Sequence, residues 1–301
     1  MKPATQIKRK RSVNTGILFL LPWLTGFVVF KLFPFLSSLF YSFTDFNLFQ
    51  GITKYGLMNY HKIFTDSVTC RSLLTTIRFA LTEVPLRLVA ALLTACLLTK
   101  KLRCIKVFRV IYYIPSILGS SVAVSVLWKA FFRDDGAVNT LLSVFGIHNI
   151  AWLSNPAYTL YMICLMKVWQ FGSSMVVFMA ALKSVDTQLY DAARIDGASK
   201  IKCFSSITLP MISPAVFYNL VIQLCLAFQE FNSVYIITHG GPRQSTNLFS
   251  LLIYNNAFVS YDIGMASAMS WVIFIFTAFA TLLTFKSQKY WVFYNDEENR
   301  R

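Results

Sequence analysis

The side chains best placed to bind a solute are polar groups inside two long apolar runs, at about residues 157–182 and 209–237. Amide and indole groups at that depth are expensive to bury, so they usually face a bundle interior or an aqueous cavity. On a continuous helix, Gln229 and Asn232 are three positions apart and can face one cavity, while Glu230 points about 100° away. The alternative is that these groups only bond to neighbouring helices and hold them together. The residues that we predict to line a path for a solute through the membrane are Trp169, Gln170, Gln223, Gln229 and Asn232.

No pattern typical of catalysis or metal binding accompanies these residues. The sequence has no G-x-x-x-x-G-K-S/T phosphate-binding loop, no H-E-x-x-H and no G-x-S-x-G motif. The three His residues are far apart in sequence, and the six Cys residues include no C-x-x-C pair. We therefore predict no catalytic residue, no metal ligand and six free thiols.

The composition predicts an all-α integral membrane protein. Of 301 residues, 56% are hydrophobic and only 14% are charged, far fewer than a soluble domain of this length carries. Within the second apolar run, Glu83 and Arg87 are four apart and can pair on one helix face. We predict a basic segment at 1–15, a membrane domain at 16–285 and a polar tail at 286–301. The six predicted spans cover about residues 16–43, 73–98, 107–132, 157–182, 209–237 and 264–285.

The basic residues predict the orientation of these spans. A formal net charge of +15 can indicate a nucleic-acid partner, but here the basic residues do not alternate with stacking aromatics on a soluble patch. Eighteen of the 28 Lys and Arg residues lie in the two terminal segments and in the loops at 100–109 and 183–202, and only five lie in the opposite loops. The positive-inside rule then places both termini in the cytosol. The first run continues without a small-residue cleavage site, which favours a retained span over a signal peptide.

The longest polar interruption of the second half of the chain, Leu189 to Pro214, is predicted to be a helix–turn–helix. Asp186 can cap a helix from Thr187 to about Ile195, and Gly197 suits a residue with positive φ. A second helix is expected from about Ser199 to Ser206, before Pro210 and Pro214. Leu189 is expected to share one face of this region with three small residues, Ala192, Ala193 and Ala198. Small side chains make this face smooth and let another surface approach closely. The alternative is an amphipathic helix that only links two spans.

This stretch resembles the E-A-A loop of permease subunits of bacterial ABC importers of the carbohydrate-uptake type, the maltose, multiple-sugar and glycerol-phosphate group. The family pattern is E-A-A, then D-G-A, then L-P. Here it reads Asp191-Ala192-Ala193, Asp196-Gly197-Ala198 and Leu209-Pro210, with Asp191 in the usual place of Glu. Further segments that are similar to this family are YGLMNYHKIFTD and the T-x-G-G-P loop that contains Gly240-Gly241-Pro242. The resemblance covers about residues 16 to 285.

The resemblance implies a type I ABC importer permease (MetI-like) in the bacterial cell membrane, surrounded by lipid. It implies a coupling region at 186–210 that docks on a cytosolic ATPase, and a solute that is a sugar or oligosaccharide, for which amides and an indole provide suitable partners. The implied partners are a second permease subunit, identical or different, two ATPase subunits that hold ATP–Mg, and an extracytoplasmic solute-binding protein. The chain itself is expected to bind no cofactor and no nucleic acid. The alternatives are an ATP-independent carrier or channel and, more remotely, a membrane enzyme.

Overall fold

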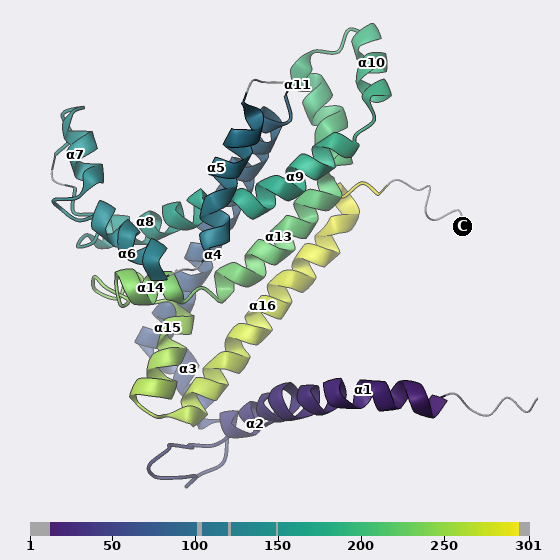
Figure 1. Cartoon of the computed structure of the whole chain (residues 1–301). Coiled ribbons are helices and arrows are strands. Elements are labelled where there is room, and N and C mark those ends of the chain that lie inside the picture. Colours follow the sequence, from purple (N-terminus) through teal and green to yellow (C-terminus); the bar gives the residue numbers. More distant parts are fainter. Residues whose placement is uncertain (1–12, 101–103, 120–121, 149, 295–301) are drawn as a thin grey trace, which may run out of the picture.

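The computed structural model describes residues 13–100, 104–119, 122–148 and 150–294, and these residues are almost entirely helical (Figure 1). The described part of the chain contains isolated β-bridges, such as that between Thr44 and Tyr55, but no β-strand of a sheet. Most of the predicted basic segment at 1–15 lies outside the described residues, and so do residues 295–301 of the predicted tail. The helices are α1 (Val13–Phe27), α2 (Phe33–Ser42), α3 (Met58–Thr65), α4 (Ser67–Leu98), α5 (Ile105–Leu118), α6 (Val122–Phe131), α7 (Ala137–Ser143), α8 (Pro156–Trp169), α9 (Gly172–Ser184), α10 (Thr187–Ile195), α11 (Lys200–Cys203), α12 (Leu209–Met211), α13 (Ser213–Phe228), α14 (Asn232–Ile237), α15 (Phe249–Tyr254) and α16 (Ile263–Trp291), with π-helical turns at Val28–Leu32, Phe204–Thr208 and Asn255–Val259.

Three helices are long and apolar enough to cross a membrane unbroken: Phe19–Ser42, Ser67–Leu98 and Ile263–Trp291. Three bent pairs can each form one further span, which gives up to six and agrees with the predicted number. The pair α8 and α9 bends by 46°, and the segment 200–211 bends by 63° relative to α13. The apolar runs at about residues 157–182 and 209–237 therefore do not form straight helices. The fifth is interrupted a second time at residues 229–231, between α13 and α14.

Helix α4 is the centre of the bundle and contacts α8, α9, α13 and α15. Asp66 caps its first turn, because its carboxylate accepts hydrogen bonds from Thr69 N at 2.9 Å and Thr69 Oγ1 at 2.6 Å. These bonds stabilise the ionised form and lower the pKa of Asp66. Further along α4, Phe79 packs with Ile163 and Phe178 in a fully buried apolar core. Figure 1 shows α1 and α2 extending away from this bundle, and α2 packs on α16.

The bend between α8 and α9 depends on a close approach to α5. A Cβ atom on Gly172 would lie only 2.7 Å from both Ser116 Oγ and Tyr112 O. Since both neighbours belong to α5 and one is backbone, a larger residue would push α9 away from α5. Gly172 therefore fixes the angle at which the fourth span turns.

The six cysteines, Cys70, Cys96, Cys104, Cys164, Cys203 and Cys225, all lie among the described residues and are free thiols, as predicted. Cys70 and Cys96 stand on the same helix about 39 Å apart, far beyond the reach of a disulfide. We expect mass spectrometry of protein alkylated after unfolding, without reduction, to find all six cysteines labelled. An intrachain bridge in that experiment would contradict both the packing and the predicted topology.

Candidate functional site

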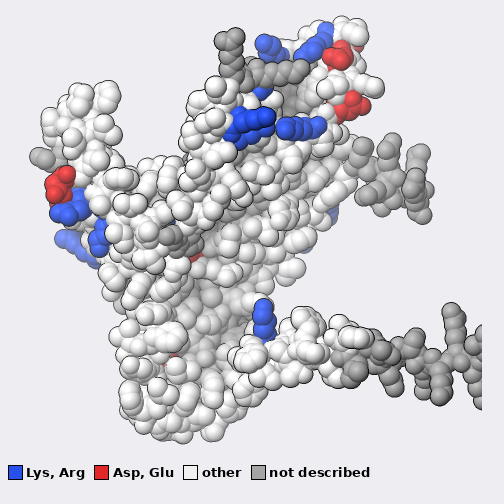
Figure 2. All heavy atoms as spheres, in the orientation of Figure 1, with Lys and Arg blue, Asp and Glu red and all other residues white. Residues whose placement is uncertain are grey.

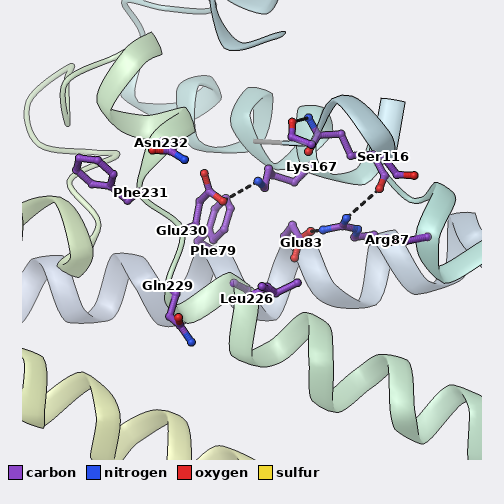
Figure 3. Close-up of a pocket in the computed structure, with 14 residues that line it drawn as sticks. Phe79, Glu83, Arg87, Ser116, Lys167, Leu226, Gln229, Glu230, Phe231 and Asn232 are labelled. Atoms are coloured by element: carbon purple, nitrogen blue, oxygen red, sulfur yellow. Dashed lines mark hydrogen bonds and ion pairs between the residues drawn. The ribbon is translucent and has the colours of Figure 1, made fainter. Parts of the chain in front are cut away.

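A cavity of about 440 Å³ lies beside the middle of α4, where three bent spans break (Figure 3). Helix α4 contributes Phe79, Glu83 and Arg87 to its wall. The breaks contribute Gly119 at the end of α5, Gln170 between α8 and α9, and Gln229, Glu230 and Phe231 between α13 and α14. Breaks in spanning helices leave backbone groups free of the helical ladder, and such groups are tolerated where they border a cavity or are buried in protein.

Arg87 joins two walls of this cavity. Its Nη1 lies 3.1 Å from Glu83 Oε1, which confirms the pairing predicted from their spacing. Its Nη2 donates to the carbonyl of Gln170 at 2.9 Å, and the Gln170 amide in turn donates to the carbonyl of Gly119 at 3.0 Å. One chain of polar contacts therefore ties α4 to the break of the fourth span and to the end of α5.

A second ion pair closes the opposite wall. Lys167 Nζ lies 2.6 Å from Glu230 Oε2, and the two side chains are only 10% and 8% exposed. Figure 3 shows the side chains of Lys167 and Glu230 pointing toward each other beside the cavity. The other oxygen of Glu230 accepts from Ser233 N at 3.0 Å and Ser233 Oγ at 2.6 Å, and thereby caps α14. Both cations of the cavity are thus neutralised by carboxylates of the same chain.

The expectation that Glu230 points away from the cavity is wrong, because it assumed an unbroken helix through residues 229–232. Lys167, which also lines the cavity, was not among the residues predicted to line the solute path. The sequence does contain a signal for this pair, namely a basic residue in the fourth run, Lys167, and an acidic residue in the fifth, Glu230. Opposite charges within membrane spans usually pair with one another.

Of the predicted path residues, Gln170, Gln229 and Asn232 line the cavity. Gln229 and Asn232 reach it from the two ends of the break, and neither side chain forms a hydrogen bond within the described residues. Trp169 and Gln223 are not among its lining residues: Trp169 packs against Trp128 with ring centroids 5.7 Å apart, and the Gln223 amide donates to Ser174 Oγ at 3.1 Å. The contacts of these two side chains fit the alternative of helix–helix bonding.

The predicted helix–turn–helix is present at one end of the bundle (Figure 1). Asp186 caps α10 by accepting from Gln188 N at 2.9 Å, and Gly197 turns the chain with φ of +74°. Ser199 begins the second helix, accepting from Lys202 N at 3.3 Å. This helix does not stop at residue 206 as expected, because α11 continues through a π-helical turn into α12, which contains Leu209 and Pro210.

The surface of this helix–turn–helix carries apolar side chains in the open. Ile195 and Ile201 are 87% and 82% exposed, and Leu189 is also exposed. Ala192 is exposed, and Ala193 and Ala198 are half-buried. Asp191 pairs with Arg194 at 3.2 Å on the same surface, and Asp196 ends α10. Figure 2 shows Lys, Arg, Asp and Glu gathered at this end and in a second group on the side of α7, while most of the visible face is uncharged.

Exposed isoleucines among small and charged residues indicate a contact surface for another protein. No group of three or more His, Cys, Asp or Glu residues that could hold a metal is found in the described part of the chain. The arrangement therefore offers a polar cavity and, at the helix–turn–helix, an exposed apolar surface.

Comparisons with known proteins agree with this arrangement. The chain is 40% identical to the probable ABC transporter permease protein YesP of Bacillus subtilis (strain 168) over an alignment of 303 positions that covers 98% of each chain. It is 34% identical to the lactose transport system permease protein LacF of Rhizobium radiobacter, covering 93% of this chain and 96% of LacF. The structure matches that of a bacterial ABC transporter involved in the import of the acidic polysaccharide alginate, with a TM-score of 0.80, 21% identity, and coverage of 91% of this chain and 95% of that one.

These matches confirm the resemblance and the all-α permease architecture predicted from the sequence. Residues 75–291, more than half of the chain, match the family described as "Binding-protein-dependent transport system inner membrane component". Proteins of this family are membrane permease subunits and not enzymes, as expected for this chain. The chain belongs to the family of inner membrane components of binding-protein-dependent transport systems.

Proposed function

We propose that this chain is a permease subunit of an ATP-driven importer for a sugar or oligosaccharide, and that the solute passes the cavity beside α4. The observation that carries this proposal is the pair of unbonded amides, Gln229 and Asn232, in a cavity whose charges are already paired. Free amides donate to and accept from hydroxyl groups, and a neutral wall suits an uncharged solute. The names of relatives support a carbohydrate, since they include permeases for lactose and for trehalose/maltose.

The proposed partners follow from the family and from the surface of the helix–turn–helix. Two cytosolic ATPase subunits would hold ATP–Mg, and one of them would receive α10, Gly197 and α11. A second permease subunit, different from this one, would complete the pore. A solute-binding protein would deliver the sugar, which is supported by the solved structure of a bacterial alginate ABC transporter in complex with a periplasmic protein bound to an alginate pentasaccharide. In this arrangement the coupling surface and both termini face the cytosol, in keeping with the distribution of basic residues.

The proposed mechanism is alternating access, in which movement of the ATPase is passed to the spans through α10 and α11. A solute or partner shifts such an equilibrium only by its difference in affinity for the two states. Because the cavity is built from helix breaks, a change of angle at residues 170–171 or 229–231 alters its lining directly. The decisive experiment is reconstitution of the chain with and without the candidate ATPase subunits. ATP-dependent uptake only in their presence is expected, whereas uptake by the chain alone would identify a carrier.

We expect Gln229→Ala and Asn232→Ala each to lower sugar uptake by about 3- to 10-fold, the effect of losing one or two hydrogen bonds to the solute. Assembly should stay normal, since neither amide bonds to the protein. Gln223→Ala is the matched control, because it removes an amide that bonds Ser174 outside the cavity lining.

The measurements are uptake, sugar-stimulated ATPase activity in proteoliposomes, and co-purification of the subunits. A changed preference among sugars in the two cavity variants would strengthen the assignment. Near-normal uptake combined with weakened assembly would instead show that these amides only hold helices together.

A further inference from the structure

A second cavity, of about 480 Å³, lies between the start of α4, the start of α8 and residues 243–245. Three arginines line it: Arg71, Arg78 and Arg243. No Asp or Glu belongs to its lining, and none of the three guanidinium groups forms an ion pair or side-chain hydrogen bond within the described residues. Three like charges that face one space without a counter-charge indicate a site for an anion.

This cavity is separate from the one proposed for the solute. Arg71 and Arg78 are seven positions apart and share one face of α4, whereas Glu83 lies about 120° further round the helix from Arg71. The two sites therefore occupy different sides of the same helix, and an anion bound by the arginines would not meet Gln229 or Asn232.

The depth of Arg78 makes an unpaired charge costly. Arg78 follows Ser67 by 11 residues, about 16 Å along the helix axis, within a candidate membrane span. Charged groups within spans are expensive unless they find a partner, although a long side chain can reach toward the interface. Reaching in that direction brings Arg78 toward Arg71 and Arg243.

Two details of the wall also favour a bound anion. The first residues of α8, Pro156 and Ala157, border the cavity, and the start of a helix carries a partial positive charge. Ser245 Oγ is buried in this wall without a partner among the described residues and is free to donate a hydrogen bond.

The surroundings show which class of anion fits. Leu74 lies beside the arginines in an adjoining cavity, and Leu81, one further heptad along, is exposed on the same face of α4. On α8, Tyr161 lines the arginine cavity and Leu165, one turn further, is exposed. A cationic pocket that opens on apolar surface at the end of two spans suits a molecule with an anionic head and hydrocarbon tails. A small soluble anion would leave that apolar surface unused.

We propose that this pocket binds an anionic phospholipid. Its phosphodiester lies among Arg71, Arg78 and Arg243, and its acyl chains lie along the outward faces of α4 and α8. In the orientation proposed above, this lipid belongs to the extracytoplasmic leaflet.

The test uses the complete importer in nanodiscs that contain phosphatidylcholine with a minor share of phosphatidylglycerol. Native mass spectrometry counts the phosphatidylglycerol molecules that remain bound after release from the disc. The variant is the triple replacement Arg71→Gln, Arg78→Gln and Arg243→Gln. We expect it to bind phosphatidylglycerol about 100-fold more weakly, since each arginine near a lipid headgroup contributes roughly 5-fold.

Arg133→Gln is the matched control, because Arg133 is exposed, pairs with Asp135 and lies outside the pocket. A triple Arg→Lys variant at positions 71, 78 and 243 keeps the charge and should retain most of the binding. Equal loss of phosphatidylglycerol in the Arg133→Gln variant would overturn the site.

A photo-reactive phosphatidylglycerol tests the unaltered protein, so the outcome does not depend on the triple variant folding. Labelled peptides should map to residues 71–81 and 156–165. Labelling elsewhere overturns the proposal, as does displacement of the lipid by excess inorganic phosphate, which would identify a site for free anions. A cross-link from an Arg78→Cys variant to the second permease subunit, with lipid binding unchanged, would identify a subunit interface instead.

Discussion

Replacing Gly197 with Val is expected to abolish ATP-driven uptake while leaving membrane insertion intact. Gly197 has φ of +74°, and apart from Gly197 itself and its two chain neighbours no residue has an atom within 4 Å of the place where a Cβ would stand. The obstacle to a larger residue is therefore the backbone conformation and not a lack of space. A left-handed conformation costs an ordinary L-residue about 1–2 kcal/mol, and it is least suited to β-branched side chains. Val at this position should open the turn and separate α10 from α11.

Gly197→Asn is the control that distinguishes conformation from size. Asn tolerates the left-handed region and has a side chain of similar bulk to Val. Uptake and co-purification of the ATPase should be largely kept in the Asn variant and lost in the Val variant. Wild-type uptake with a stably bound ATPase in the Val variant would contradict the coupling role. Loss in both variants would show that the docked partner leaves no room at this position.

Ala193→Arg tests the same contact from the side of α10. Ala193 is half-buried, and its carbonyl accepts a hydrogen bond from Ala198 N at 2.9 Å across the turn. A long charged side chain on this smooth face should prevent close docking and abolish transport, without changing the turn itself. If the ATPase remains bound and uptake is normal, the docking surface lies elsewhere on the loop.

The helix–turn–helix could be predicted from sequence because its causes are local. An Asp before the first turn, a Gly after the last and a Ser before the next helix each act within three residues of the backbone group that they serve. For this reason the start and end of α10 agree with the prediction. The end of the second helix does not, because its π-helical turn is tied by Tyr190 of α10, whose hydroxyl lies 2.8 Å from Thr208 Oγ1.

The breaks in the spans could not be predicted in the same way. An apolar run has the same composition whether its helix is straight or bent, so hydropathy alone does not locate a bend. At residues 229–231, the interruption is stabilised by groups distant in sequence, since Glu230 bonds to Lys167 of α8 and its carbonyl accepts from Ser250. For this reason Glu230 and Lys167 line the cavity although the sequence did not predict it. The roles of Gln170, Gln229 and Asn232 in transport stay predictions.

Breaking the ion pair of Lys167 and Glu230 should strongly lower the stability of the folded chain, because both side chains are buried. Lys167→Met leaves a buried carboxylate without its cation, and Glu230→Gln leaves a buried ammonium group without its anion. Each single change is expected to lower the free energy of unfolding by about 3–5 kcal/mol, the usual result of breaking a buried pair. Glu230→Gln keeps a carbonyl oxygen that can accept from Ser233 N, so the cap of α14 is retained and the change reports mainly the lost charge.

The double variant Lys167→Met with Glu230→Gln separates the cost of an unpaired charge from the value of the pair. Removing both charges avoids an uncompensated buried ion, so the double variant should be more stable than either single variant. Unfolding in detergent, with uptake measured in parallel, gives both readouts. A double variant less stable than both single variants would contradict this account of the pair. If stability returns without uptake, the charges also serve the solute path; if both return, the pair only holds the fourth span to the break of the fifth.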